Sequence, residues 1–150
     1  MIGWGSQGVS ASDGDTCSIQ VTVATVLKEV QPDGRILVLM RDPVARMYSA
    51  FWYYGCRYDI YKKYGMTADG FHEFAAKEVS VLNQCLDKGS SIRECARTLF
   101  YTAQQLIKGI YAAFAPDWLA AYPANQVMWV RSEDYFANPE HHIQVLFTPR

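Results

Sequence analysis

The segment that most constrains the fold of this 150-residue chain is the uninterrupted apolar run Ile36-Leu37-Val38-Leu39-Met40, followed at once by Arg41-Asp42-Pro43. A short apolar run bounded by a turn and a proline favours a strand buried on both faces, as in a parallel sheet. Asp42 is placed to cap a helix, and Pro43 suits the first helical position. The segment therefore predicts a buried strand that leads directly into a helix.

Apolar residues at helical spacing surround this strand. They predict helices from Val23 to Val30, from Pro43 to about Gly55 and from about Ala68 to Leu86. A further helix should open at the capping box that begins at Ser91 and continue through Leu99, Leu106 and Ile110. The residues expected to face the core are Val44, Met47, Tyr48 and Phe51 in the helix after Pro43, and Phe71, Phe74, Ala75, Val79 and Leu82 in the next.

A second apolar run, Val127–Val130, predicts another buried strand. Strand, helices, strand and helix form an α/β order, so we expect a few-stranded parallel sheet flanked by helices. The length suits one domain, and a composition that is 50% hydrophobic and 19% charged argues against disorder. Residues 1–16 are rich in Gly, Ser and Asp and are expected to form a flexible lead-in to a domain over residues 17–150.

Charge and hydropathy exclude several functions. Fourteen Lys and Arg against fifteen Asp and Glu give a net charge of −1, which disfavours a nucleic-acid partner. No apolar run approaches the roughly 20 residues of a membrane span, and the N-terminus does not resemble a signal peptide. Residues 3–8 match G-x-G-x-x-G, but no strand precedes them, so we interpret the match as accidental.

The strand-to-helix junction is the best candidate for a binding site. Ligands of α/β sheets bind beyond the carboxyl ends of strands, where helix N-termini attract anions. Arg41 lies there and can hold a phosphate through two parallel hydrogen bonds, while Ser49 lies two turns along the helix. Asp42 and Arg46 are spaced to pair with each other. The alternative is that Arg41 and Arg46 form only surface ion pairs.

The remaining chemistry-bearing residues give weaker signals. Cys17, Cys56, Cys85 and Cys95 allow three complete pairings, and four buried thiols are an alternative. No C-x-x-C pair is present, and His141-His142 lacks a nearby ligand cluster, so no metal is expected. His72 is interpreted as a helix-surface or capping residue, and we assign no catalytic residue.

Residues 36–49 closely resemble the 3′-phosphate-binding element of the sulfotransferases. These enzymes transfer a sulfuryl group from 3′-phosphoadenosine 5′-phosphosulfate (PAPS) to a hydroxyl or amine. The chain is most similar to the carbohydrate branch, particularly to enzymes of the N-acetylgalactosamine 4-sulfate 6-O-sulfotransferase type. The resemblance covers residues 21–147 and includes Thr67–Glu73, Gly109–Tyr111, Trp118-Leu119 and Val130–Tyr135.

This resemblance implies a P-loop-NTPase-like fold, PAPS as the sulfate donor, no metal and a location in the Golgi lumen. Carried over by position, Arg41 and Ser49 would bind the 3′-phosphate, and Cys85 and Cys95 would form a disulfide. The acceptor would be a sulfated or acidic carbohydrate similar to a glycosaminoglycan. Five cations and two carboxylates within residues 41–63, with eight aromatic residues between Tyr48 and Tyr64, suit such a ligand.

The chain also departs from the family pattern. It lacks the family's N-terminal lysine-containing loop for the 5′-phosphosulfate and its C-terminal segment, so we expect a partial domain. The alternative function is that of a catalytically inactive remnant that binds an anionic glycan or a partner subunit. The aromatic residues also have two interpretations: Tyr48 and Phe51 are interpreted as core residues, whereas for Tyr58, Tyr61 and Tyr64 a core position and a ligand contact are both left open.

Overall fold

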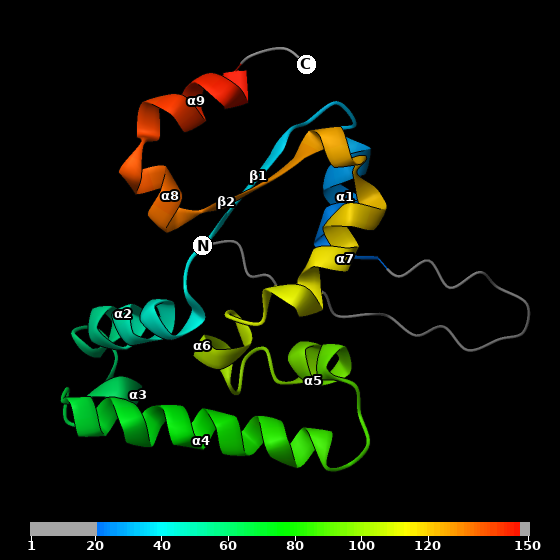
Figure 1. Cartoon of the computed structure of the whole chain (residues 1–150). Helices are drawn as coiled ribbons and strands as arrows, with labels where there is room; N and C mark the ends of the chain where they lie inside the picture. Colours follow the sequence, from blue (N-terminus) through cyan, green and yellow to red (C-terminus); the bar gives the residue numbers. More distant parts are fainter. Residues whose placement is uncertain (1–20, 148–150) are drawn as a thin grey trace, which may run out of the picture.

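In the computed structural model, which describes residues 21–147, the two apolar runs form β1 (Ile36–Met40) and β2 (Val127–Arg131). The strands pair in parallel, with Ile36 opposite Val127 and Met40 opposite Arg131. Helices account for most of the rest of the described chain (Figure 1). The predicted α/β fold, with a few-stranded parallel sheet flanked by helices, is therefore confirmed.

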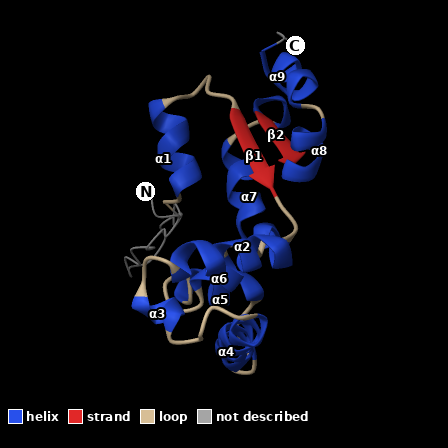
Figure 2. Ribbon diagram, turned by 90° about the vertical axis from the view of Figure 1, so that its left-hand side faces the viewer, coloured by secondary structure: helices blue, strands red, loops and turns tan. Residues whose placement is uncertain are grey.

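The prediction that β1 is buried on both faces is wrong within the described part of the chain. Ile36 and Val38 pack into a core, whereas Leu37 is 38% and Leu39 49% exposed. The reason is that α1 (Val23–Val30) and α7 (Tyr111–Ala121) supply packing partners to one set of alternating side chains only. Figure 2 shows both helices close to the two strands.

The core beside the sheet is built from α1, α7 and the strands. Ala24, Trp118, Tyr122 and Val127 are buried there. Thr22 and Thr25 form a capping box at the start of α1, so this short helix begins with its first backbone N–H groups satisfied.

A second core joins α2 (Pro43–Gly55), α3 (Asp59–Lys62) and α4 (Ala68–Leu86). The ends predicted for α2 and α4 are confirmed. The buried members of this core are Met47, Phe51, Tyr61 and Phe74, so Tyr61 is a core residue and Tyr58 is exposed.

Three residues expected to face the core are exposed instead: Val44, Tyr48 and Val79. In α4 the buried position is that of Glu78, not Val79, because Glu78 satisfies backbone groups of a neighbouring helix. Val44 lies in the first turn of α2, away from the residues of that helix that pack into the core.

The long helix predicted from Ser91 to Ile110 is broken in the structure. The capping box at Ser91 is present, but α5 (Ile92–Thr98) stops with Leu99 as its C-cap, and α6 (Gln104–Ile107) is a separate single turn. The break lets Phe100, Ala103 and Ile107 enter one core with Leu82 and Cys95. The structure contains a disulfide between Cys85 and Cys95, the pair that the resemblance implies, and Cys56 is an exposed free cysteine.

The described chain closes with the 3₁₀ turn η1 (Ala124–Gln126), then β2, α8 (Ser132–Ala137) and α9 (Pro139–Phe147). Within residues 21–147, no helix combines the length and apolar character needed to cross a bilayer. The predicted lead-in over residues 1–16, the glycine motif at 3–8 and Cys17 lie outside the described residues.

Candidate ligand-binding site

The carboxyl end of β1 is held in place by two other elements. The hydroxyl of Tyr111, the first residue of α7, accepts a hydrogen bond from the Arg41 backbone N–H at 3.2 Å and donates one to the Arg41 carbonyl oxygen at 3.1 Å. The Asp42 N–H donates to Oε1 of Glu133, just after β2, at 3.3 Å. The backbone at Arg41 is therefore fixed between α7 and the end of β2, while its side chain is exposed.

The start of α2 faces the same edge of the sheet. Oδ1 of Asp42 accepts a hydrogen bond from the Ala45 N–H at 2.7 Å and so caps the helix, as predicted. Ser49 is exposed and lies seven residues after Asp42. At about 100° per residue, this spacing returns Ser49 to within about 20° of the Asp42 side of the helix. Ser49 thus lies two turns along α2, on the same side of the helix as its cap Asp42.

The predicted pairing of Asp42 with Arg46 is not found. The Asp42 carboxylate is used as the cap, and Arg46 turns toward α6, where its Nη2 donates to the Gln105 carbonyl oxygen and its Nη1 to Gln105 Oε1 at 3.4 Å. Arg46 therefore links α2 to α6. Gly109 marks a close approach: a Cβ there would lie 3.1 Å from Pro43 Cβ, so the connection from α6 to α7 runs close against the first turn of α2.

The buried carboxylate of Glu78, in α4, binds the start of α6. Glu78 is only 7% exposed, and its oxygens accept hydrogen bonds from the Leu106 N–H at 2.6 Å and the Gln105 N–H at 3.4 Å. Gln105 in turn donates from Nε2 to the Tyr61 hydroxyl at 3.0 Å. These bonds satisfy first-turn N–H groups that a helix leaves without partners.

Burial perturbs the pKa of each ionisable group in this cluster. It raises the pKa of Glu78, against the effects of the two backbone N–H groups and of Arg46. It raises the pKa of the Tyr61 hydroxyl and lowers the pKa of the Arg46 guanidinium. Burial, followed by the charge of Arg46, also lowers the pKa of Lys108.

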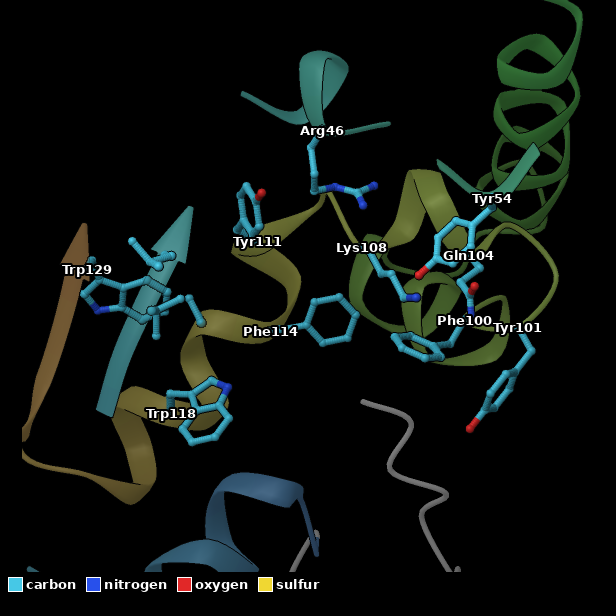
Figure 3. Close-up of a pocket in the computed structure, with 13 residues that line it drawn as sticks. Arg46, Tyr54, Phe100, Tyr101, Gln104, Lys108, Tyr111, Phe114, Trp118 and Trp129 are labelled. Atoms are coloured by element: carbon cyan, nitrogen blue, oxygen red, sulfur yellow. The ribbon is translucent and has the colours of Figure 1, made fainter. Parts of the chain in front are cut away.

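A cavity of about 560 Å³ lies between β1, α7 and the α5–α6 region (Figure 3). Figure 3 shows Arg46 at one end of it and Trp118 at the other, with Lys108, Phe100 and Phe114 between them. The lining residues are Val38, Leu39, Arg46, Tyr54, Phe100, Tyr101, Gln104, Lys108, Tyr111, Phe114, Ala115, Trp118 and Trp129. Neither Arg41 nor Ser49 lines it.

Sequence reasoning missed Glu78, Lys108 and the role of Tyr111. A signal for Glu78 was present, because it lies four residues from both Phe74 and Leu82 and so falls within the apolar stripe of α4. Nothing in the local pattern marked Lys108, which becomes part of the cavity only through the path of the chain after α6.

His72, His141 and His142, which the sequence does not predict to be metal ligands, lie on the helices α4 and α9. His72 is exposed on α4, and the His141 backbone N–H donates to Asn138 Oδ1 at 3.2 Å near the start of α9. No group of three or more His, Cys, Asp or Glu residues in the part of the chain that the structure describes is arranged to hold a metal ion.

Comparisons with known proteins identify the family of this chain. The family model described as "Sulfotransferase domain" matches residues 21–148. Carbohydrate sulfotransferase 15 from Homo sapiens and that from Rattus norvegicus are each 28% identical over 120 residues, and that from Mus musculus is 27% identical; each match covers 78% of this chain and 20% of the relative. The chain thus spans about a fifth of the length of these curated relatives, and no solved structure gives a significant match. The chain belongs to the sulfotransferase domain family.

Proposed function

We propose that this chain forms the part of a PAPS-dependent carbohydrate sulfotransferase that holds the 3′-phosphate of the nucleotide, with Arg41 and Ser49 as its ligands. The observation that carries the proposal is the position of Arg41, at the carboxyl end of a parallel strand and directly before a capped helix. Such a junction combines a guanidinium with the positive end of a helix, which suits a phosphate.

The residues around the junction fit this role. The Tyr111 hydroxyl and the Glu133 carboxylate hold the backbone at Arg41 and Asp42, so little ordering of the main chain is needed when a phosphate binds. Arg41 and Ser49 are both exposed and therefore accessible to a ligand. PAPS supplies the sulfuryl group, and these two residues would position the donor without taking part in bond breaking.

The family and its relatives support the substrate class. The matched relatives carry the name carbohydrate sulfotransferase, and we extend a carbohydrate acceptor to this chain on that basis. An acidic glycosaminoglycan is the acceptor that the excess of cations within residues 41–63 favours. We also propose a location in the Golgi lumen, where the Cys85–Cys95 disulfide would persist because the lumen of the secretory pathway is oxidising.

A transfer assay tests this function. The chain is incubated with PAPS labelled in its sulfuryl group and with chondroitin sulfate, and the label on the polysaccharide is measured. We expect transfer by the wild type, a marked loss for Arg41→Ala, and retention for Lys77→Ala, a control in which an exposed cation of α4 is removed. If the wild type is folded and binds nucleotide but transfers no label, the enzyme assignment fails and the chain is better described as a glycan-binding remnant.

A further inference from the structure

Two cations, Lys108 and Arg46, line the cavity beside β1. Lys108 is half-buried in its wall, and its ammonium makes no ion pair or hydrogen bond within the described chain. The Nε of Arg46 is buried and also has no partner there, although the rest of that guanidinium is bound to Gln105. No Asp or Glu is among the described lining residues.

This arrangement is electrostatically unfavourable without a ligand. Burial removes water from the Lys108 ammonium, and the nearby Arg46 charge repels it; both effects lower the pKa of Lys108. The charge of Glu78 offsets part of this effect, but its oxygens bind the backbone N–H groups of α6 and it does not line the cavity. An anion that entered the cavity would therefore gain two charge-assisted contacts and relieve the repulsion between the cations.

The rest of the wall indicates what would carry that anion. The rings of Phe100, Phe114 and Tyr101 provide flat apolar surfaces, which suit the carbon faces of a sugar ring. The hydroxyl of Tyr54 and the amide of Gln104 add groups that can bind sugar hydroxyls. The volume, about 560 Å³, lies within the range of small-molecule sites.

We propose that this cavity binds the acidic group of a sulfated or carboxylated sugar, with Lys108 and Arg46 as its cationic contacts. The inference rests on the proposed function, because it identifies where the acceptor carbohydrate is held. A sugar fits better than the nucleotide, since the cavity lies along the flank of α2 and includes neither Arg41 nor Ser49. The donor and acceptor sites then meet at Tyr111, which lines the cavity and bonds to the Arg41 backbone.

Intrinsic fluorescence offers a direct test, because Trp118 and Trp129 both line the cavity. The full chain is titrated with a chondroitin sulfate tetrasaccharide and with its chemically desulfated counterpart. We expect Lys108→Gln to weaken binding of the sulfated tetrasaccharide about ten- to hundredfold, the range for loss of one charged hydrogen bond. Lys108→Arg should restore most of the affinity, and the control Lys77→Gln, at an exposed lysine of α4, should leave it unchanged.

The outcomes separate this inference from the proposed function. Arg41→Ala should retain tetrasaccharide binding while it loses affinity for adenosine 3′,5′-bisphosphate. Equal tetrasaccharide affinity in the wild type and a folded Lys108→Gln variant would overturn the inference but leave the role of Arg41 standing. Displacement of the tetrasaccharide by adenosine 3′,5′-bisphosphate, together with loss of nucleotide binding in Lys108→Gln, would instead assign the cavity to the nucleotide and would also overturn the inference.

Discussion

Glu78 shows how a single residue can depart from its pattern for a structural reason. Its position in the apolar stripe of α4 predicts a hydrophobic side chain, yet a buried carboxylate is found there, bonded to the start of α6. The α6 turn is too short to be stable by itself, so an acceptor from another helix is what secures it. The irregular residue in the stripe thus marks where two helices are joined.

The raised pKa of Glu78 predicts a particular pH dependence of stability. Above the ordinary carboxyl pKa of 4.5 and below the raised value, the folded protein keeps a proton that the unfolded chain has released. The free energy of unfolding should therefore fall as the pH rises through this window. Glu78→Gln cannot titrate, so this part of the decline should vanish in urea-denaturation curves recorded at several pH values. Parallel pH profiles for the two proteins would contradict the assignment.

At the scale of elements, the starts of helices follow local sequence closely. Asp42, Thr67 and Ser91 each cap the helix that the sequence predicts after them. These features are predictable because a cap depends on a few neighbouring residues. The break between α5 and α6 and the one-sided burial of β1 were not, because both depend on which distant elements pack nearby.

The cap of α2 gives a prediction for this element. Asp42→Ala removes the acceptor of the Ala45 N–H and should lower the free energy of unfolding by about 1 kcal/mol. Asp42→Asn retains an oxygen at the same place and should stay within a few tenths of a kcal/mol of the wild type. Urea denaturation of both variants checks this, and an equal loss in both would show that the charge, rather than the cap, is what matters.

At the scale of the whole molecule, the three small cores found within residues 21–147 are connected by a few specific contacts. Arg93 and Arg97 both pair with Asp117 and so link α5 to α7, while the disulfide links the end of α4 to α5. The parallel sheet was predictable from two apolar runs. The cavity was not, because Arg46 and Lys108 come together only through contacts between α2 and the chain around α6.

The disulfide should contribute measurably to the stability of this assembly. It closes a loop with a sequence separation of 10 residues, and the chain-entropy model gives about 3 kcal/mol for a loop of this size. The double variant Cys85→Ala/Cys95→Ala should lose about that much free energy of unfolding, with an added packing cost because Cys95 is fully buried. Cys56→Ala, at an exposed free cysteine, is the control and should unfold as the wild type does. A loss below about 1 kcal/mol in the double variant would refute the stabilising role.

The most direct measurement for the whole account is a calorimetric titration of adenosine 3′,5′-bisphosphate into the wild type, Arg41→Ala and the control Arg57→Ala. If Arg41 holds the 3′-phosphate where β1 meets α2, its removal should weaken binding by about 1.5–3 kcal/mol, roughly ten- to hundredfold, while the control keeps wild-type affinity. Identical nucleotide affinity in the wild type and a folded Arg41→Ala variant would contradict the account.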